Sequence, residues 1–213
     1  MKPLTLILCL LLVPALACST TSIAENLVPS GGVLYQDYFG SPDSGWGDLS
    51  SPAGTAGYVD GAYHIMPTQP NINLWTHPGK DFASVRAEVS VITISGPQSN
   101  RVGLVCRLKD DNNFYFFVIS ADGFYGIGKM KAGITSLLSS TEMLPHEAIL
   151  TGNQINRIRA DCAGNALSLH VNNVMVTSVN DDDFTSGDVG ILAGSFDKPG
   201  SDIYFDNFVV YKP

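Results

Sequence analysis

Aromatic and charged side chains alternate with apolar ones along several segments of this chain, in a pattern whose chemistry suits recognition of a polyhydroxylated ring. Aromatic rings stack on the C–H faces of sugar rings, while arginine and glutamate supply directional hydrogen bonds. Two cysteines are expected to point into the core, and strand alternation then places a set of aromatic and charged residues on the outward face of one sheet. Trp75, in the loop before Asp81, would lie at the rim of that face. The predicted ligand-binding residues are Trp75, Arg86, Arg107, Tyr115, Phe117 and Tyr125, joined by Glu88.

A plainer interpretation stands beside this one. Tyr115 and Phe117 lie in a segment that is apolar at every position from 114 to 119, so they could pack beneath a covering loop. Arg86 and Glu88 could form a solvated charge pair. The four histidines are scattered and indicate surface or loop positions rather than metal ligands: His64, His77, His146 and His170.

The periodicity of the chain is that of strands. Val85-Ala87-Val89-Val91 alternates with Arg86-Glu88-Ser90, and Leu167-Leu169-Val171 alternates with Ser168-His170-Asn172. Two-residue alternation of this kind predicts half-buried strands. Turn residues separate the segments, and Asn172-Asn173 favours a tight hairpin because Asn tolerates positive φ. About a dozen short strands at such spacing predict an all-β sandwich of two antiparallel sheets.

Four cysteines occur, and their positions differ in meaning. Cys9 leaves with the predicted signal sequence, so Cys18, Cys106 and Cys162 remain. An odd number in an exported protein needs an explanation, and a lipid on Cys18 would leave the other two to pair. Both lie on the apolar side of an alternating segment, which favours a disulfide between Cys106 and Cys162. Two buried free thiols are the alternative.

The N-terminus predicts export. Lys2, the apolar run from Leu4 to Val13 and the small residues before Cys18 form a secretory signal too short to span a bilayer. A cysteine directly after the cleavage site is typical of bacterial lipoproteins, although Ala15-Leu16-Ala17 also fits an ordinary signal peptidase site. We expect a signal peptide over 1–17, a tether over 18–32 and one domain over 33–213. The protein is then lipid-anchored to the bacterial membrane and faces the extracytoplasmic side.

The charge balance excludes one class of partner. The full chain has 12 Lys and Arg against 20 Asp and Glu, a formal charge of −8, and losing Lys2 with the signal makes it −9. Nucleic acid is therefore a poor ligand, because binding phosphates needs a basic face.

The order of several short motifs resembles that of a known fold family. The chain resembles the concanavalin A-like jelly roll that laminin-G-type domains, legume lectins and endo-β-glucanases share. Within that fold group it is most similar to the 3-keto-disaccharide hydrolase domain. The likeness covers nearly all of 33–211. It rests on Tyr35-Gln36-Asp37-Tyr38-Phe39, Ser44-Gly45-Trp46, Asp60-Gly61, Leu74-Trp75, Asp81-Phe82, Arg86-Ala87-Glu88 and Phe205-Asp206-Asn207-Phe208.

This resemblance implies further site residues. The jelly-roll glucanases carry an E-x-D-x-x-E strand motif as nucleophile and acid/base, and this chain has none. If activity on 3-keto-glycosides extends to this chain, Glu88 is the implied acid/base. The glucanases also hold a structural Ca²⁺, whose matching positions here are Asp37, Gly61 and Asp206. Carboxylate and carbonyl oxygens are the ligands that Ca²⁺ accepts.

The expected function is glycan binding at the cell surface without catalysis. One alternative is an enzyme, a hydrolase or lyase acting on 3-keto-glycosides. A second alternative is a protein-interaction module of the laminin-G type, which binds through its rim loops. An open aromatic groove would favour the binding protein, whereas a closed pocket with an acid and an arginine would favour the enzyme.

Overall fold

A computed structural model describes residues 28–213 of the chain. These residues form β-strands and one short 3-10 helix, η1 (Pro42–Ser44). Among them, no helix has the length and hydropathy needed to cross a bilayer. The predicted signal sequence, Cys18 and most of the predicted tether lie outside the described residues.

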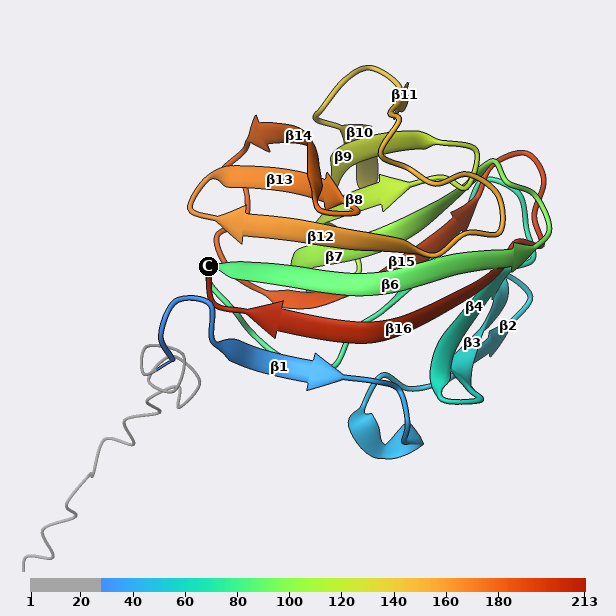
Figure 1. The fold of residues 1–213 in the computed structure, drawn as a ribbon, viewed down its shortest axis with the longest axis horizontal. Helices are drawn as coiled ribbons and strands as arrows, with labels where there is room; N and C mark the ends of the chain where they lie inside the picture. Colours follow the sequence, from blue (N-terminus) through green and yellow to red (C-terminus); the bar gives the residue numbers. More distant parts are fainter. Residues whose placement is uncertain (1–27) are drawn as a thin grey trace, which may run out of the picture.

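The strands form two antiparallel sheets that face each other (Figure 1). Sheet A has the order β14-β13-β12-β6-β16-β4-β3-β2, with β1 also paired to β16. Its strands are β1 (Val33–Asp37), β2 (Leu49–Ser51), β3 (Gly54–Val59), β4 (Ala62–Pro67), β6 (Val85–Ser95), β12 (Asn156–Ala163), β13 (Ala166–Val171), β14 (Val174–Asn180) and β16 (Asp202–Tyr211).

Sheet B has the order β10-β9-β8-β7-β15-β5, with the short β11 paired to β9. Its strands are β5 (Asn73–Thr76), β7 (Asn100–Asp110), β8 (Asn113–Ile119), β9 (Phe124–Lys131), β10 (Ile134–Leu137), β11 (Leu144–Pro145) and β15 (Asp188–Ser195). The predicted all-β sandwich of two antiparallel sheets is confirmed.

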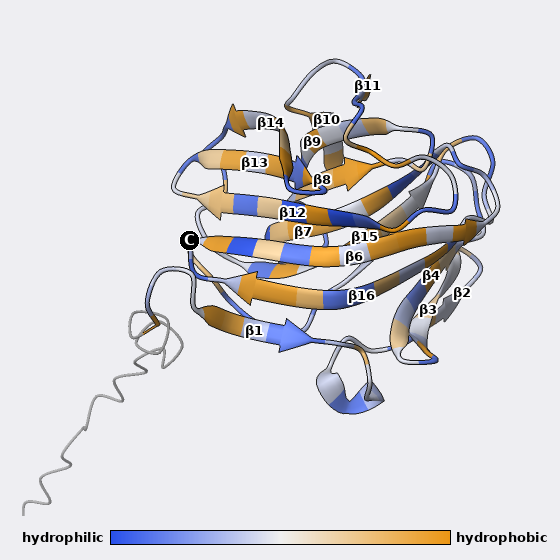
Figure 2. Ribbon diagram, viewed as in Figure 1, coloured by the Kyte–Doolittle hydropathy of each residue, from blue (hydrophilic) through white to orange (hydrophobic). Residues whose placement is uncertain are grey.

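Alternation in the sequence explains why these segments pair as strands. Along β6, Val85, Ala87, Val89 and Val91 are buried while the residues between them are partly exposed. Figure 2 shows the same alternation of apolar and polar colour along β6. At the predicted hairpin between β13 and β14, Asn172 and Asn173 have φ of 51° and 69°. These are the left-handed angles that a two-residue hairpin with the sheet's own twist requires.

The inner faces of the two sheets enclose the main core. Cys106 in β7 and Cys162 in β12 form a disulfide within this core, with 6.9 Å between their Cα atoms, and both residues are fully buried. The predicted pairing is therefore confirmed. Because β7 belongs to sheet B and β12 to sheet A, the disulfide joins the two layers covalently.

The two ends of the described chain lie side by side (Figure 1). Gly31 N–H donates to the Lys212 carbonyl at 2.8 Å, and Lys212 N–H donates to the Gly32 carbonyl at 2.9 Å. The Ser30 hydroxyl donates to the carbonyl of Pro213 at 2.6 Å. These bonds continue the pairing of β1 with β16 beyond the strand ends, so the chain enters and leaves the sandwich at one place.

Candidate functional site

Strand β8 turns the opposite face outward from the one we predicted. Tyr115 and Phe117 are fully buried in the core between the sheets, so the prediction that they point away from the disulfide is wrong. Tyr115 lies directly opposite Cys106 on β7, and directly paired residues share a face of the sheet. The strand is apolar on both sides, so alternation alone could not tell which side faces inward.

Arg107 is also misplaced by simple alternation, because a β-bulge interrupts β7 after Cys106. Arg107 has φ of 52°, and its side chain is buried rather than facing outward as predicted. Its guanidinium donates to the carbonyls of Phe184 at 2.8 Å and Gly164 at 2.7 Å, and to that of Ala83 at 3.4 Å. Arg107 therefore fastens three connecting segments together and is not available to a ligand.

Arg86 and Glu88 do face outward, but from sheet A. Glu88 accepts a hydrogen bond from Arg157, and Arg86 Nε donates to Asp161 Oδ1 at 3.3 Å. The prediction that they share a face with Tyr115 and Phe117 is wrong, because alternation does not reveal to which sheet a strand belongs. These charges form a cross-strand network on β6 and β12. Arg86 and Glu88 each pair with a residue of β12, whereas the plainer interpretation paired them with each other.

Tyr125, at the start of β9, is partly buried and packs against the main core. Its ring lies 5.9 Å from that of His146 in an edge-to-face arrangement. The prediction that Tyr125 faces outward is therefore also wrong.

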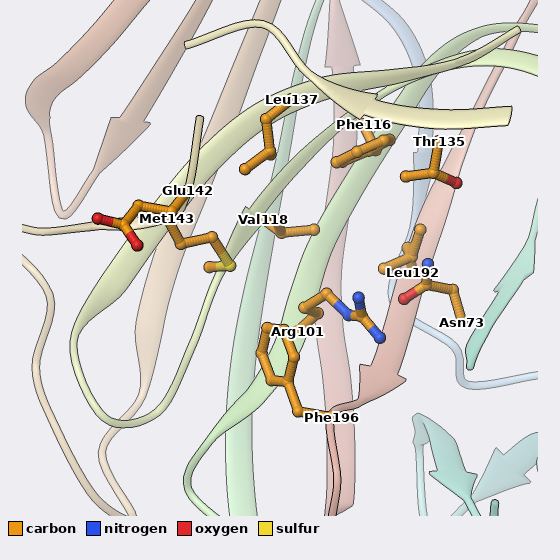
Figure 3. A pocket seen from close by; sticks show the side chains of 10 residues that line it. All are labelled: Asn73, Arg101, Phe116, Val118, Thr135, Leu137, Glu142, Met143, Leu192 and Phe196. Carbon is orange, nitrogen blue, oxygen red and sulfur yellow. The ribbon is translucent and has the colours of Figure 1, made fainter. Parts of the chain in front are cut away.

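The outward face of sheet B carries a second apolar cluster, made by side chains of β7, β8 and β15. Phe114, Phe116, Val118 and Leu192 belong to it, and Trp75, Leu137 and Met143 pack on it. A hollow of about 260 Å³ opens among these side chains (Figure 3), and we call it the middle hollow. Its lining residues are Asn73, Arg101, Phe116, Val118, Thr135, Leu137, Glu142, Met143, Leu192 and Phe196.

Two further hollows adjoin the middle one and share lining residues with it. One, of about 290 Å³, shares Glu142, Met143 and Phe196 and extends toward Asp122. The other, of about 540 Å³, shares Asn73 and extends toward Trp75 and Asp111. We call the three together the sheet B groove. It extends from the β8–β9 turn to the edge strand β5.

Glycines on β9 make room for this groove. A Cβ at Gly128 would collide with the Phe116 ring, and one at Gly126 would come within 2.9 Å of Leu137. Both positions therefore need a residue without a side chain if these apolar groups are to lie flat on the sheet.

Trp75 is the predicted site residue that the structure does place at the groove. It lies on β5, its ring is 5.1 Å from that of Phe114, and its Nε1–H donates to Asp111 Oδ1 at 3.3 Å. The indole is thus held over the outward face by a ring on one side and a carboxylate on the other. Sequence reasoning missed Phe114 and Phe116 because it assigned the opposite face of β8 to the ligand.

Arg101 is a partly buried cation that lines the middle hollow, and sequence reasoning also missed it. Its guanidinium lies 4.4 Å from the ring centroid of Phe196 and donates to the carbonyls of Ile72 at 3.3 Å and Ser195. Burial lowers the pKa of Arg101 from its usual value, yet an arginine stays protonated in proteins. No motif marked this residue, because its role depends on contacts with distant loops.

Two polar atoms at the base of the middle hollow have no hydrogen-bond partner. They are Nε of Arg101, a donor, and Oδ1 of Asn73, an acceptor. A Cβ at Gly194 would lie 2.1 Å from Asn73 Oδ1 and 3.1 Å from Arg101 Nε, so these two atoms fill the space over that glycine. A buried polar atom without a partner costs about 1–3 kcal/mol, so these two atoms lower the stability of this part of the fold.

Beside the Trp75 end of the groove lies a histidine held by a buried carboxylate. His77 Nδ1 is 2.7 Å from Asp188 Oδ2, which also accepts from the Lys80 N–H at 2.8 Å. The hydrogen bond to Asp188 raises the pKa of His77 above its usual value, and the charges of Asp188 and Asp111 add to this effect. Asp188 is almost completely buried, whereas the His77 ring is partly exposed.

The three positions implied for calcium are partly brought together. Phe205 pairs with Tyr63, which places Asp206 beside the turn that contains Gly61, and Asp37 pairs with the nearby Phe208. The Asp37 carboxylate, however, accepts hydrogen bonds from Phe39 N–H at 2.7 Å and from Trp46 Nε1 at 2.8 Å. Within residues 28–213, no three His, Cys, Asp or Glu side chains cluster as a metal site. A Ca²⁺ ion at this corner would therefore take one carboxylate, that of Asp206, and its other ligands would be backbone carbonyls.

Comparison with known proteins shows the fold. No family model matches the chain. A sulfatase of Formosa agariphila is 28% identical over 153 residues, which are 72% of this chain and 22% of that protein. The chain therefore spans less than a quarter of the length of the curated relative that it matches.

Solved structures with little sequence identity share the architecture. A Bacillus subtilis protein of unknown function with a galectin-like fold superposes with a TM-score of 0.63 at 12% identity, over 86% of this chain and 97% of that one. A Bacteroides ovatus mixed linkage glucan GH16, in complex with a G4G4G3G product, gives 0.60 at 10% identity over 84% and 100%. The carbohydrate-binding module CBM66 of B. subtilis gives 0.53 at 16% identity over 79% and 92%.

These likenesses and the two-sheet topology define the class: a jelly-roll β-sandwich of the galectin-like and concanavalin A-like kind. The narrower resemblance to the 3-keto-disaccharide hydrolase domain stays a prediction.

Proposed function

We propose that the protein binds a neutral glycan in the sheet B groove and does not cleave it. The observation that carries the proposal is the middle hollow. There, aromatic and aliphatic side chains form most of the wall, and the polar side chains of Arg101 and Asn73 complete it. Sugar rings present the matching chemistry, with C–H faces for the rings and hydroxyl groups for the polar side chains.

The electrostatics of the groove favour a neutral ligand over an acidic one. Asp111, Asp122 and Glu142 line its three hollows, whereas Arg101 is partly buried and already bonded to two carbonyls. An anionic sugar would meet three carboxylates before it reached one cation. Several of the solved structures of the same fold are named as carbohydrate-binding or glycoside-cleaving proteins, which supports a glycan ligand.

The proposal is tested by a glycan-array screen of protein beginning at Val28, where the described sandwich begins, followed by calorimetry with any hit. Trp75→Ala is expected to weaken binding at least about tenfold, because the indole supplies stacking area at the groove. Tyr204→Ala is the matched control, since Tyr204 is an aromatic residue on the outward side of sheet A, where it lines a separate hollow.

Equal affinity of the wild-type protein and Trp75→Ala for the hit would contradict the proposed groove. An array without any hit would favour the second alternative, a module that binds proteins through its rim loops.

The enzyme alternative receives a separate test at Glu88. We propose binding without turnover because Glu88 projects from sheet A, opposite the groove, and is paired with Arg157. Incubation of any bound glycan with the protein, alone and as its 3-keto derivative, is expected to release no product. Release that Glu88→Gln abolishes would establish the hydrolase or lyase instead.

We also propose a structural Ca²⁺ at the corner where Asp206 meets the Asp60-Gly61 turn. Backbone carbonyls would supply the remaining ligands. The melting temperature is expected to rise by a few degrees with millimolar calcium, and Asp206→Ala should remove this rise. Asp202→Ala serves as the control, because the Asp202 carboxylate accepts from His64 Nε2 at 2.6 Å in the same strand. A melting temperature that ignores calcium in the wild-type protein would contradict the site.

A further inference from the structure

Strand β14, with seven residues, is the longest strand at an edge of either described sheet. Among residues 28–213 only β13 pairs with it, and Figure 1 shows it at the upper border of sheet A. The other edges are shorter: β2 has three residues, β5 and β10 have four, β11 has two, and β1 has five with an irregular register. Short or irregular edges discourage pairing with a second chain, because they offer few aligned backbone groups.

The second half of β14 directs backbone groups away from the sheet. A bulge bends the first half, and the register with β13 is regular from Thr177 to Asn180. In the same register, Asp181 N–H donates to the Asn165 carbonyl at 2.9 Å. Alternate residues of an antiparallel strand bond to the same neighbour. The N–H and C=O groups of Ser178 and Asn180 therefore point outward, where another extended strand is the natural partner.

The charges at this edge suit a second copy of the same chain. β14 itself contains no charged residue and no proline, the two features that commonly block an exposed edge. The whole chain has a formal charge of −8, which makes its copies repel one another. Around β14, however, the charges on β6, β9, β12, β13 and residues 181–183 balance, with five on each side: Arg86, Lys129, Lys131, Arg157 and Arg159 against Glu88, Asp161, Asp181, Asp182 and Asp183.

We infer that β14 pairs antiparallel with β14 of a second copy, so that sheet A continues across a two-fold dimer. A register centred on Val179 places Ser178 of each copy opposite Asn180 of the other, where their outward N–H and C=O groups bond. The same register sets Asp181 opposite Thr177, so no carboxylate lies opposite a carboxylate. The strand is thus complementary to its own copy, as a two-fold interface requires.

The symmetry of this dimer has a consequence for the sheet B groove. A two-fold axis that relates antiparallel strands of one sheet is perpendicular to that sheet. The two grooves of the dimer therefore face the same side and are both open to one multivalent glycan. The dimer itself does not rest on the proposed glycan binding, and it is measured without any glycan.

Sedimentation equilibrium of protein beginning at Val28 tests the dimer. One strand pair is a small interface, so we expect weak association, with the mean mass rising from one chain at about 10 µM toward two chains at about 500 µM. At the higher concentration the Ser178 amide should exchange with solvent at least about tenfold more slowly than in the dilute protein.

A mass of one chain across this range would overturn the inference and leave the edge to a strand of another protein. A dimer in which exchange of the Ser178 amide is not slowed would also overturn it, because the contact would then lie elsewhere.

Substitutions at one position locate the interface. Ser178→Pro removes an outward N–H and leaves the bonds to β13 in place, so it should raise the dissociation constant of the dimer at least about tenfold. Ser178→Thr is the matched control, because it keeps the N–H and adds no charge, and its dissociation constant should stay within about threefold of the wild-type value.

If the near-UV circular dichroism of Ser178→Pro departs from that of the wild-type protein, Ser178→Lys replaces it, because a charge on an edge strand opposes pairing. Ser50→Lys is its matched control, since Ser50 is an exposed residue of β2 at the other edge of sheet A. Dimerisation at wild-type strength in a folded Ser178→Pro or Ser178→Lys protein would overturn the inference.

Discussion

Two histidines occupy opposite electrostatic environments, one on each sheet. His77 is bonded to Asp188, which raises the pKa of His77. His170 packs in the charge network of sheet A, where burial lowers its pKa and Arg159 lowers it further, against the opposing charge of Asp161. The usual value is about 6.5. The two groups should therefore change the stability of the protein in opposite directions as pH changes.

The direction in which each histidine changes the stability with pH follows from the linkage between protonation and folding. The stabilisation from His77 is complete below the pKa of the unfolded chain, about 6.5, and is lost as pH rises through the higher folded value. For His170 the folded value is the lower one, so its stabilisation is present above about pH 6.5 and is lost as pH falls.

NMR titration of the histidine ring protons from about pH 5 to about pH 8 should give a midpoint above the usual value for His77 and below it for His170. His77→Gln and His170→Gln assign the signals. A single common midpoint for the two rings would contradict the model of two opposed environments.

Arg107 is expected to contribute strongly to stability. Its three hydrogen bonds run to carbonyls of three different connections, and its side chain is almost fully buried. Arg107→Met keeps the bulk of the chain but leaves these carbonyls without their donor, and should lower the free energy of unfolding by about 3 kcal/mol. Urea denaturation measures the change.

Arg157→Met is the control for this substitution, because Arg157 is more than half exposed and its ion pair with Glu88 lies at the surface. It should cost no more than about 1 kcal/mol. Similar losses for the two variants would mean that Arg107 does not fasten the three connections.

At the scale of strands, the disulfide joins β7 to β12 and thereby the two layers. It closes a loop with a sequence separation of 56 residues. On the chain-entropy model such a loop is worth about 4 kcal/mol. The double variant Cys106→Ala, Cys162→Ala should therefore unfold at lower denaturant concentration than the oxidised wild-type protein. Adding reductant should lower the wild-type midpoint and leave that of the double variant unchanged; an effect on both would contradict the assignment.

The strands also show where sequence reasoning stops. Alternation located β6, β12 and β13, and it placed Cys162 inward, because polar residues marked the outer side of each of these strands. It also placed Cys106 of β7 inward, although most of that strand is buried on both sides. On β8 both sides are apolar, so Tyr115 and Phe117 were assigned to the wrong face. Of the predicted ligand-binding residues, only Trp75 therefore lies at the sheet B groove.

A local irregularity accounts for the error at Arg107. The bulge after Cys106 resets the alternation of β7, so Leu108 faces outward although Leu104 faces inward. Nothing in the run from Leu104 to Leu108 indicates this, because positive φ at an arginine depends on the tertiary bonds that hold it. Arg101 escaped notice for the same reason: its partners, Ile72 and Ser195, are distant in sequence.

At the scale of the whole molecule, the predicted lipid anchor decides where the groove works. Cys18 lies outside the described residues, so the anchor stays a proposal. Cys18→Ala should abolish incorporation of labelled fatty acid and move the protein from the membrane to the soluble fraction, because a thiol is needed to form the thioether. A Cys9→Ala variant should retain the label. A Cys18→Ala protein that remains fully membrane-bound would contradict the lipoprotein interpretation.

The closeness of the two ends has a consequence for the connectivity of the fold. Gly31 and Gly32 bond to Lys212 across the seam between β1 and β16, so only a short bridge would be needed to join the ends. The order of strands along the chain is then not essential to their arrangement in space. A circular permutant, joined at this seam and opened between the exposed residues Asn173 and Val174 of the β13–β14 hairpin, should recover both sheets. By the same geometry, the sandwich could sit within a loop of another domain without separating that loop's ends.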